Sequence, residues 1–375
     1  MWKTSHHPFH WYVDFFPLME SGGFDAVVGN PPYIAASAIR PHYNVKNYET
    51  SDASDIYAWC LERIARLVSE SGATGMIVPL SLGFSRDFKS TRTLLYREDQ
   101  DHWCSSYGRI PAALFAADVR VRNVIHIGRK GSGPKRQRTT RLYRWFEGYR
   151  SSLMPTLGYV DFDPACWKGR IPKLGSTSMV QAFESLLAVA NGKTVRSSLQ
   201  REPTPNVLCY KKSAYNWLSF GRFEAPCFDS VGNVIAQTKY GSVYFRSQAE
   251  RDTATLLLNG KLQLAFWAAI GDDFDVTNWM FDEFPVDLGW LAAELGQAGR
   301  AAADQLWVRM QESVSFKLNA GKQVGNFNLS KLRPLTDQTD IQICEHLGWG
   351  TELWQEIELL YAHTVKTQTE EVSDD

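Results

Sequence analysis

Asn30, Pro31, Pro32 and Tyr33 form a run of four residues whose chemistry suits a planar, conjugated amine. The lone pair of such a nitrogen is delocalised, so the amine is a poor nucleophile until acceptors draw its hydrogens out of the plane. The Asn30 side-chain oxygen and the Pro31 carbonyl are two such acceptors, and the consecutive prolines hold the carbonyl in place before any reaction. The Tyr33 ring offers a stacking face worth about 1–3 kcal/mol for a nucleobase. The run therefore predicts a site that activates an amino nitrogen on a flat ring.

The residues around this run supply the elements that must position it. Residues 24–29 (FDAVVG) are a short apolar run that ends at Asn-Pro-Pro, which predicts a buried strand leading into a tight loop. Strand and helix patterns then alternate to about residue 130, which predicts an open α/β sheet with ligands beyond the carboxyl ends of its strands. A nucleobase that binds beyond the carboxyl end of such a strand must first be flipped out of its duplex. The other expected elements are a helix over about 56–68, a strand at 76–78, a helix over 90–97 and strands near 105–110 and 123–127.

With these elements around it, the string GFDAVVGNPPYI (23–34) resembles motif IV of amino-group methyltransferases. Residues 54–85 are similar to the helix and strand that follow the motif, and residues 122–133 resemble the late strand before the target-recognition region. The family is that of N6-adenine DNA methyltransferases with an NPPY motif, in large restriction-modification and phage-defence systems. The resemblance implies S-adenosylmethionine as cofactor, double-stranded DNA as substrate, and Asn30, Pro31, Pro32 and Tyr33 as catalytic residues.

The same resemblance assigns a second aromatic residue to the site. Phe115, in the string ALFAADVRV, resembles the aromatic residue that closes over the opposite face of the flipped adenine. With Tyr33, it would hold the base between two rings. The alternative for Phe115 is a place in the core.

A change of pattern near residue 130 predicts a second domain. Residues 150–250 are rich in Pro and Gly without a sustained period, and two helices are expected later, over about 249–270 and 288–314. Residues 256–286 and 319–337 are similar to the C-terminal recognition region of the same family. The predicted organisation is a partial Rossmann-like methyltransferase sheet at 1–130, a basic linker at 131–150, a mixed α+β DNA target-recognition domain at 151–350, and a C-terminal helix with an acidic tail at 351–375.

Basic residues are concentrated although the net charge is only -1. Residues 129–150 contain eight Lys or Arg but one acid, Glu147, and aromatic residues are interleaved with them. Such mixtures suit contact with phosphate plus stacking, and a solvated hinge is the alternative. A looser basic set follows in 317–333. The residues predicted to contact DNA are Arg129, Lys130, Arg138, Arg141, Arg144, Lys322, Lys331 and Arg333.

The glycine-rich cofactor loop of the family is not recognisable in this sequence. It should precede the NPPY motif by about a hundred residues, whereas 29 residues lie ahead of Asn30. Gly131 and Gly133 lead into Pro134 and basic residues rather than a helix, so they cannot cradle a nucleotide in the usual way. We therefore expect a natural split subunit, a gene fragment or a truncated form, which is inactive alone and needs a separate N-terminal methyltransferase polypeptide.

Three other functions fit parts of the sequence. Cytosine-C5 methylation uses a Cys nucleophile, and Pro226-Cys227 is a Pro-Cys pair, but such a dipeptide is frequent by chance. Protein glutamine methyltransferases also use NPPY, but they are compact and do not carry a long basic extension. The non-enzyme alternative is a catalytically incompetent DNA-binding or specificity fragment.

Composition adds a few expectations. The six cysteines form no CxxC pair, which indicates reduced thiols and a cytoplasmic location. His6, His7 and His10 have no Cys or acid that completes a ligand set, so we expect no metal there. No stretch of 18 apolar residues occurs, so no membrane partner is expected.

Overall fold

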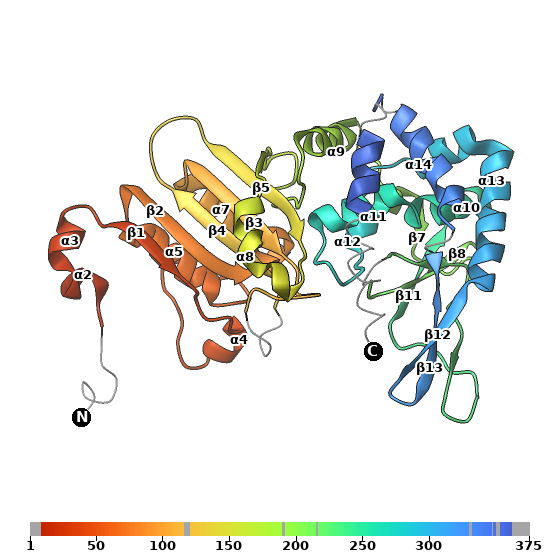
Figure 1. Cartoon of the computed structure of the whole chain (residues 1–375), viewed down its shortest axis with the longest axis horizontal. Helices are drawn as coiled ribbons and strands as arrows, with labels where there is room; N and C mark the ends of the chain where they lie inside the picture. The colour runs from red at the N-terminus through yellow and green to blue at the C-terminus, as the bar shows by residue number, and fades with distance from the viewer. Residues whose placement is uncertain are drawn as a thin grey trace. The chain divides into compact units, whose positions relative to one another are not determined.

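The computed structural model describes residues 9–115, 121–189, 192–214, 217–329, 332–346, 348–349 and 353–361. The chain divides into two compact units, Met1–Thr177 and Ser178–Asp375, and each contains its own β-sheet structure (Figure 1). Helices and strands occur in both units, which confirms the predicted α/β class. No helix within the described ranges is long and apolar enough to cross a membrane.

One six-stranded sheet, of order β1-β2-β4-β3-β5-β6, forms the first unit. β1 and β2 are parallel, as are β3 and β5, whereas β4 is antiparallel to both of its neighbours and β6 is antiparallel to β5. The elements are α2 (Trp11–Asp14), α3 (Phe16–Glu20), β1 (Phe24–Gly29), α4 (Ala36–Ile39), α5 (Tyr57–Leu67), β2 (Val68–Pro79), α6 (Ser81–Phe84), α7 (Lys89–Glu98), β3 (Asp101–Tyr107), β4 (Asn123–Arg129), β5 (Arg136–Tyr143), α8 (Arg150–Leu153) and β6 (Val160–Asp161).

The helix α5 shows how the local pattern becomes tertiary structure. Tyr57, Leu61 and Ala65 recur every four residues and are buried, so the helix presents an apolar stripe. This stripe packs α5 against β2 and α7. The Tyr57 ring stacks on Phe88 with 4.7 Å between the ring centroids. Both predicted helices of this region, over 56–68 and 90–97, agree with α5 and α7 to within two residues.

The basic stretch that follows β4 belongs to the sheet. Its central part is β5, which pairs in parallel with β3 through pairs such as Asp101 with Arg136 and Tyr107 with Tyr143. Tyr107 and Tyr143 then join Trp145 and Leu153 in a buried apolar cluster. The predicted linker at 131–150 and the predicted boundary at 130 are therefore corrected, because the first unit continues to Thr177.

Two antiparallel sheets and several helices form the second unit. The sheets have the orders β7-β11-β8-β9 and β10-β13-β12. A buried cluster joins Leu256, Leu306, Met310 and Phe327. The elements are α9 (Thr177–Val189), β7 (Leu199–Gln200), β8 (Val207–Lys211), β9 (Phe220–Gly221), β10 (Cys227–Phe228), β11 (Tyr240–Phe245), α10 (Gln248–Leu258), α11 (Lys261–Ile270), α12 (Trp279–Glu283), α13 (Leu288–Glu312), β12 (Val314–Asn319), β13 (Lys322–Phe327) and α14 (Pro334–His346).

The helix predicted over 249–270 is divided into α10 and α11 at Asn259 and Gly260. The Asn259 side chain accepts from the Phe220 amide and donates to the Phe220 carbonyl, each at 2.9 Å. A Cβ at Gly260 would lie 2.6 Å from the Asp340 carboxylate. That carboxylate accepts from the Lys261 amide at 2.7 Å and so caps the start of α11. The break therefore depends on partners that are distant in the sequence.

Candidate active site

The loop 30–33 leaves the carboxyl end of β1, the edge strand of the first sheet (Figure 1). β1 pairs in parallel with β2, and Gly29 lies opposite Met76. The loop therefore lies where the two parallel strands end together. This placement agrees with the expectation that a ligand binds beyond the carboxyl ends of strands.

Tyr33 is held in place through its hydroxyl group. The hydroxyl donates to the Ile77 carbonyl of β2 at 2.9 Å and accepts from the Asn123 side-chain amide of β4 at 3.2 Å. Burial, more than any other cause, raises the pKa of Tyr33 to about 12. The phenol is therefore neutral and acts as an anchor, while the ring orientation is fixed from both neighbouring strands.

Asp55 ties Ile34, the residue that follows the loop, to the start of α5. Its carboxylate accepts from the Ile34 amide at 3.2 Å and from the Tyr57 amide at 3.1 Å. The Ile56 amide in turn donates to the Ile34 carbonyl at 3.0 Å. Burial is the largest influence on Asp55 and raises its pKa, whereas these backbone donors oppose the rise. The C-terminal end of the loop is thus fixed by residues from the sheet and from the segment that leads into α5.

The two predicted acceptors of the loop are not used by the protein itself. Asn30 is exposed and Pro31 is buried. Among the described residues, neither the Asn30 side chain nor the Pro31 carbonyl makes a hydrogen bond. No described group of the protein therefore occupies either of these two acceptor oxygens, which belong to the same short loop as Tyr33.

The structure brings Asn30, Pro31, Pro32 and Tyr33 together but does not join Phe115 to them. Phe115 is half-buried, and the five residues after it lie outside the described part of the chain. Within the described part, its ring makes no contact with that of Tyr33. The role of Phe115 as a second stacking residue remains a prediction.

Sequence reasoning did not identify Asn123 and Asp55 as supporting residues. Asn123 lies 90 residues from Tyr33, and Asp55 lies 21 residues from Ile34. Asp55 lies in the string 54–85 and Asn123 in the string 122–133, but the resemblance of these strings assigned no role to either residue. Only the folding of β4 and α5 against the loop reveals their contacts.

Several residues of the predicted DNA-binding set have partners within the first unit. Arg138 pairs with Asp101 and with Asp161, each at 3.2 Å, and lies over the Trp103 ring. Arg129 also pairs with Asp101.

Lys130 and Arg141 of that set also have partners. Lys130 donates to the Ala65 carbonyl at 2.7 Å, and its side chain is only 12% exposed. The Arg141 guanidinium lies 5.0 Å from the centroid of the Tyr143 ring. Arg144 also has an interaction partner, so no residue of the set in this unit is free of contacts.

The predicted residues of the second unit differ in exposure. Lys322 is exposed at the start of β13. Arg333 is 8% exposed, and its guanidinium lies 4.2 Å from the centroid of the Trp217 ring and 3.4 Å from that of Tyr361. Burial lowers the pKa of Arg333 to about 10. Arg333 is therefore removed from the predicted phosphate-binding set, and Lys331 lies outside the described residues.

The β12–β13 hairpin has exposed apolar residues that sequence reasoning did not single out. Phe316 is 47% exposed and Leu318 is 79% exposed, and both lie on β12 opposite the strand that begins at Lys322. Figure 1 shows the two strands as a long projecting ribbon. An exposed ribbon with apolar and basic side chains has the features of a surface that contacts another molecule.

The open edge of β1 is the other notable feature of the first unit. β1 is a terminal strand of the sheet and pairs on one side only with a described strand, β2. Its apolar Val28 is 80% exposed. A parallel strand with exposed apolar side chains is unusual, because parallel strands are normally covered on both faces.

The unused acceptors of the loop 30–33 follow the carboxyl end of a parallel strand, which is where open α/β sheets bind their ligands. Comparisons with known proteins give two sequence matches. Residues 2–108 match the family of the Eco57I restriction-modification methylase. RM.MjaORFECS2P of Methanocaldococcus jannaschii, named as a type II restriction enzyme and methyltransferase, is 30% identical over 89 residues, or 24% of this chain and 8% of that protein. The match thus spans a small part of that relative, and the two matches support a restriction-modification methyltransferase.

Two solved structures show a weaker likeness. The type IIL restriction-modification enzyme MmeI in complex with DNA is 10% identical, with a TM-score of 0.47 over 95% of this chain and 59% of that one. The type IIG restriction endonuclease BpuSI is 17% identical, with a TM-score of 0.29 over 52% of this chain and 25% of that one. At these values the likeness carries no functional information.

Proposed function

We propose that this chain is the base-binding part of a DNA methyltransferase that modifies the N6 nitrogen of adenine with S-adenosylmethionine, at a specific sequence in a restriction-modification system. The observation that carries the proposal is the pair of unused acceptors, the Asn30 side chain and the Pro31 carbonyl, beside the anchored Tyr33 ring. The family match of residues 2–108 supports methylation as the reaction.

In the proposed mechanism, the loop prepares the amine. The flipped adenine stacks on Tyr33, while the Asn30 oxygen and the Pro31 carbonyl accept the two N6 hydrogens. These bonds draw the nitrogen towards tetrahedral geometry and direct its lone pair outwards. Because the consecutive prolines hold the Pro31 carbonyl before the base arrives, its orientation costs little during the reaction. The bound cofactor would supply the methyl group, and the methylated nitrogen would lose one of its two protons to solvent.

The described residues include groups that can bind adenine, but we find among them no glycine-rich loop of the kind that holds a nucleotide-like cofactor. A nucleotide-like cofactor is usually held by a glycine-rich loop at the start of a helix. Gly131 and Gly133 instead connect β4 to β5, so they lead into a strand. We therefore derive no step of the reaction through the cofactor, and propose that its ribose and methionine parts bind to a separate N-terminal methyltransferase polypeptide.

The open edge of β1 supports this partner. A strand added in parallel beside β1 would pair its free backbone groups and cover Val28. It would also end near the loop 30–33, where the cofactor must meet the amine. The partner would thereby complete both the sheet and the site.

The test is a reconstitution. The chain alone, and the chain with a polypeptide that carries the upstream methyltransferase region, would be mixed with duplex DNA and labelled S-adenosylmethionine. We expect methyl transfer to adenine N6 in the mixture only. Transfer to cytosine or to protein would reject the proposed substrate. DNA binding without transfer in any mixture would favour the alternative of an inactive specificity fragment.

A further inference from the structure

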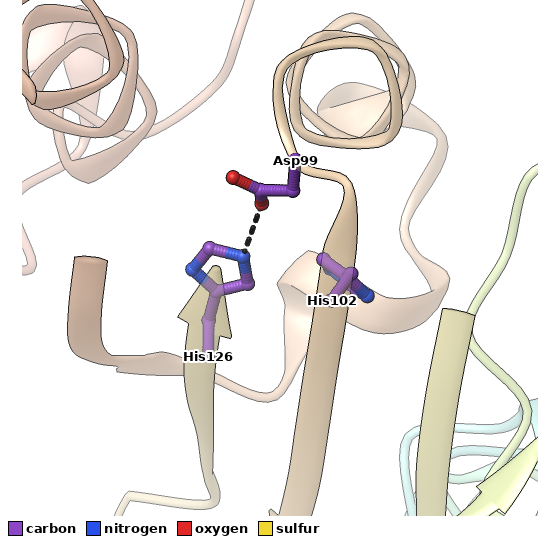
Figure 2. Close-up of side chains that lie close together, drawn as sticks. All are labelled: Asp99, His102 and His126. Atoms are coloured by element: carbon purple, nitrogen blue, oxygen red, sulfur yellow. Dashed lines mark hydrogen bonds and ion pairs between the residues drawn. The ribbon is translucent and has the colours of Figure 1, made fainter. Parts of the chain in front are cut away.

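A buried cluster of Asp99, His102 and His126 lies in the first unit, apart from the loop 30–33 (Figure 2). Asp99 follows the end of α7, His102 is on β3 and His126 is on β4. Their exposed fractions are 3%, 0% and 0%. Each offers one metal-ligating atom, and these atoms all lie within 4.8 Å of one another.

The sheet register brings these side chains to one face. His102 and Cys104 are two residues apart on β3, so their side chains point to the same side. Cys104 is paired with His126 on β4, and His102 is paired with Gly128. The Cys104 sulfur lies 3.5 Å from His102 Nε2. The face therefore contains two imidazoles and a thiol next to one another.

Gly128 leaves the space that Asp99 occupies. A Cβ at this position would lie 2.4 Å from either carboxylate oxygen of Asp99, which no side chain could tolerate. Because residue 128 is a glycine, the side chain of Asp99, which directly follows α7, can place its Oδ2 atom 3.1 Å from His126 Nε2. The Asp99 carboxylate therefore occupies the space that a side chain at position 128 would fill, although Asp99 belongs to neither strand.

The hydrogen bonds within the cluster leave part of it unsatisfied. His126 uses Nε2 towards Asp99, as Figure 2 shows, while Nδ1 of His126 and Nδ1 of His102 are buried and have no partner among the described residues. A buried polar atom without a partner costs about 1–3 kcal/mol. The hydrogen bonds among the described residues therefore leave two imidazole nitrogens of the cluster without a partner.

We propose that Asp99, His102 and His126 bind a zinc ion, with Cys104 as the fourth ligand. Zinc takes nitrogen, sulfur and carboxylate ligands at about 2.0–2.3 Å in tetrahedral geometry, and four protein ligands are typical of a structural site. The 3.1 Å between Asp99 Oδ2 and His126 Nε2 is close to the separation of about 3.3 Å between two ligands of one such ion. The three ligand atoms of Asp99, His102 and His126 lie within 4.8 Å of one another, and the Cys104 sulfur lies 3.5 Å from His102 Nε2.

The ion would clamp the end of α7 onto β3 and β4. The same strand β4 carries Asn123, whose amide holds the Tyr33 hydroxyl. The metal site would therefore stabilise the part of the sheet that anchors the loop 30–33, without contact with the reacting groups. Its role would be structural.

The test measures bound metal directly. The chain, prepared without a histidine tag and dialysed with a trace of ZnCl₂ and then against metal-free buffer, should retain about one zinc ion per molecule by mass spectrometry. Asp99→Asn should lose this zinc to background. The substituted amide can still hydrogen-bond to His126, so a purely structural pair would survive the change. A folded wild-type chain without zinc, or an Asp99→Asn variant with unchanged zinc, would overturn the proposal.

Three further samples keep the test decisive. Joint replacement of His6, His7 and His10 by Ala should leave the zinc content unchanged, and its loss there would show that the metal is held at the N-terminus instead. Replacement of zinc by Co²⁺ should produce visible bands of a tetrahedral site together with a sulfur-to-cobalt band. Cys104→Ser, which nearly preserves shape, should remove that band. A tetrahedral spectrum with no sulfur band in the wild type would overturn the assignment of Cys104.

Discussion

The loop 30–33 and the basic stretch 129–150 were both singled out by residue type, and the structure treats them in opposite ways. In the loop, the Asn30 side chain and the Pro31 carbonyl have no hydrogen-bond partner in the described part of the protein. In the basic stretch, Arg138 is bound to two carboxylates and lies on an aromatic ring. Residue type shows which chemistry is possible, whereas the availability of a group depends on which partners the fold supplies.

The largest expected effect is at Asn30. In the reconstituted enzyme, Asn30→Ala should lower turnover by about 10²–10³-fold, because one fixed acceptor for the amine is lost. DNA affinity should change little, since the site still has the Tyr33 ring. Single-turnover methyl transfer and a binding titration would separate the two quantities. Ser37→Ala, a change at an exposed residue soon after the loop, is the control. Near-normal turnover in Asn30→Ala would contradict the proposed mechanism.

The second prediction tests whether Arg138 acts in the fold rather than on DNA. Arg138→Ala should lower the free energy of unfolding by about 1–3 kcal/mol, because the buried Asp101 loses one of its cationic partners. Urea denaturation would measure this loss. Arg136→Ala, at an exposed position of the same strand, should have a smaller effect. An unchanged stability together with a flatter salt dependence of DNA binding would restore Arg138 as a phosphate contact.

A third prediction concerns Lys322, which is exposed on the β12–β13 hairpin. If it contacts a phosphate, Lys322→Ala should reduce the magnitude of the salt slope of DNA binding by about 0.9. The free energy of unfolding should change by no more than about 0.5 kcal/mol, since the side chain is at the surface. Titrations of a short duplex at several salt concentrations would give the slope. The neighbouring Gln323→Ala is the neutral control, and an equal slope in the two variants would exclude the phosphate contact.

The smallest effect on catalysis is expected at the Tyr33 hydroxyl. Tyr33→Phe keeps the stacking ring and removes two hydrogen bonds, so the free energy of unfolding should fall by about 1–2 kcal/mol. Turnover should fall less in Tyr33→Phe than in Tyr33→Ala, because only the second change removes the ring. Because burial raises the pKa of Tyr33 to about 12, the phenol stays neutral below about pH 11, and the pH dependence of turnover should be the same in wild type and Tyr33→Phe. A pH profile that changes with this substitution would show that the hydroxyl takes part in proton transfer.

Local patterns predicted much of the first unit. The apolar run 24–29 is β1, although this strand is mostly exposed and not buried as predicted, and the helix predicted over about 56–68 is α5. Such elements are encoded by neighbouring residues, so periodicity and turn residues are sufficient to locate them. The strand β5 was missed because its Arg138 and Arg141 suggested a solvated linker, while the partners that bury part of them come from β3 and β6.

By itself the sequence determined the α/β class, the position of the NPPY loop after a strand and the residue types able to activate an amine. The tertiary structure decided which groups remain available: it joined Asn123 to Tyr33 across 90 residues, buried Arg333 between two rings, and collected Asp99, His102 and His126 beside Gly128. The physical reason is that hydrogen bonds and ion pairs form over a few ångströms in space. Separation along the chain places no limit on them, so a pattern of neighbouring residues cannot show them.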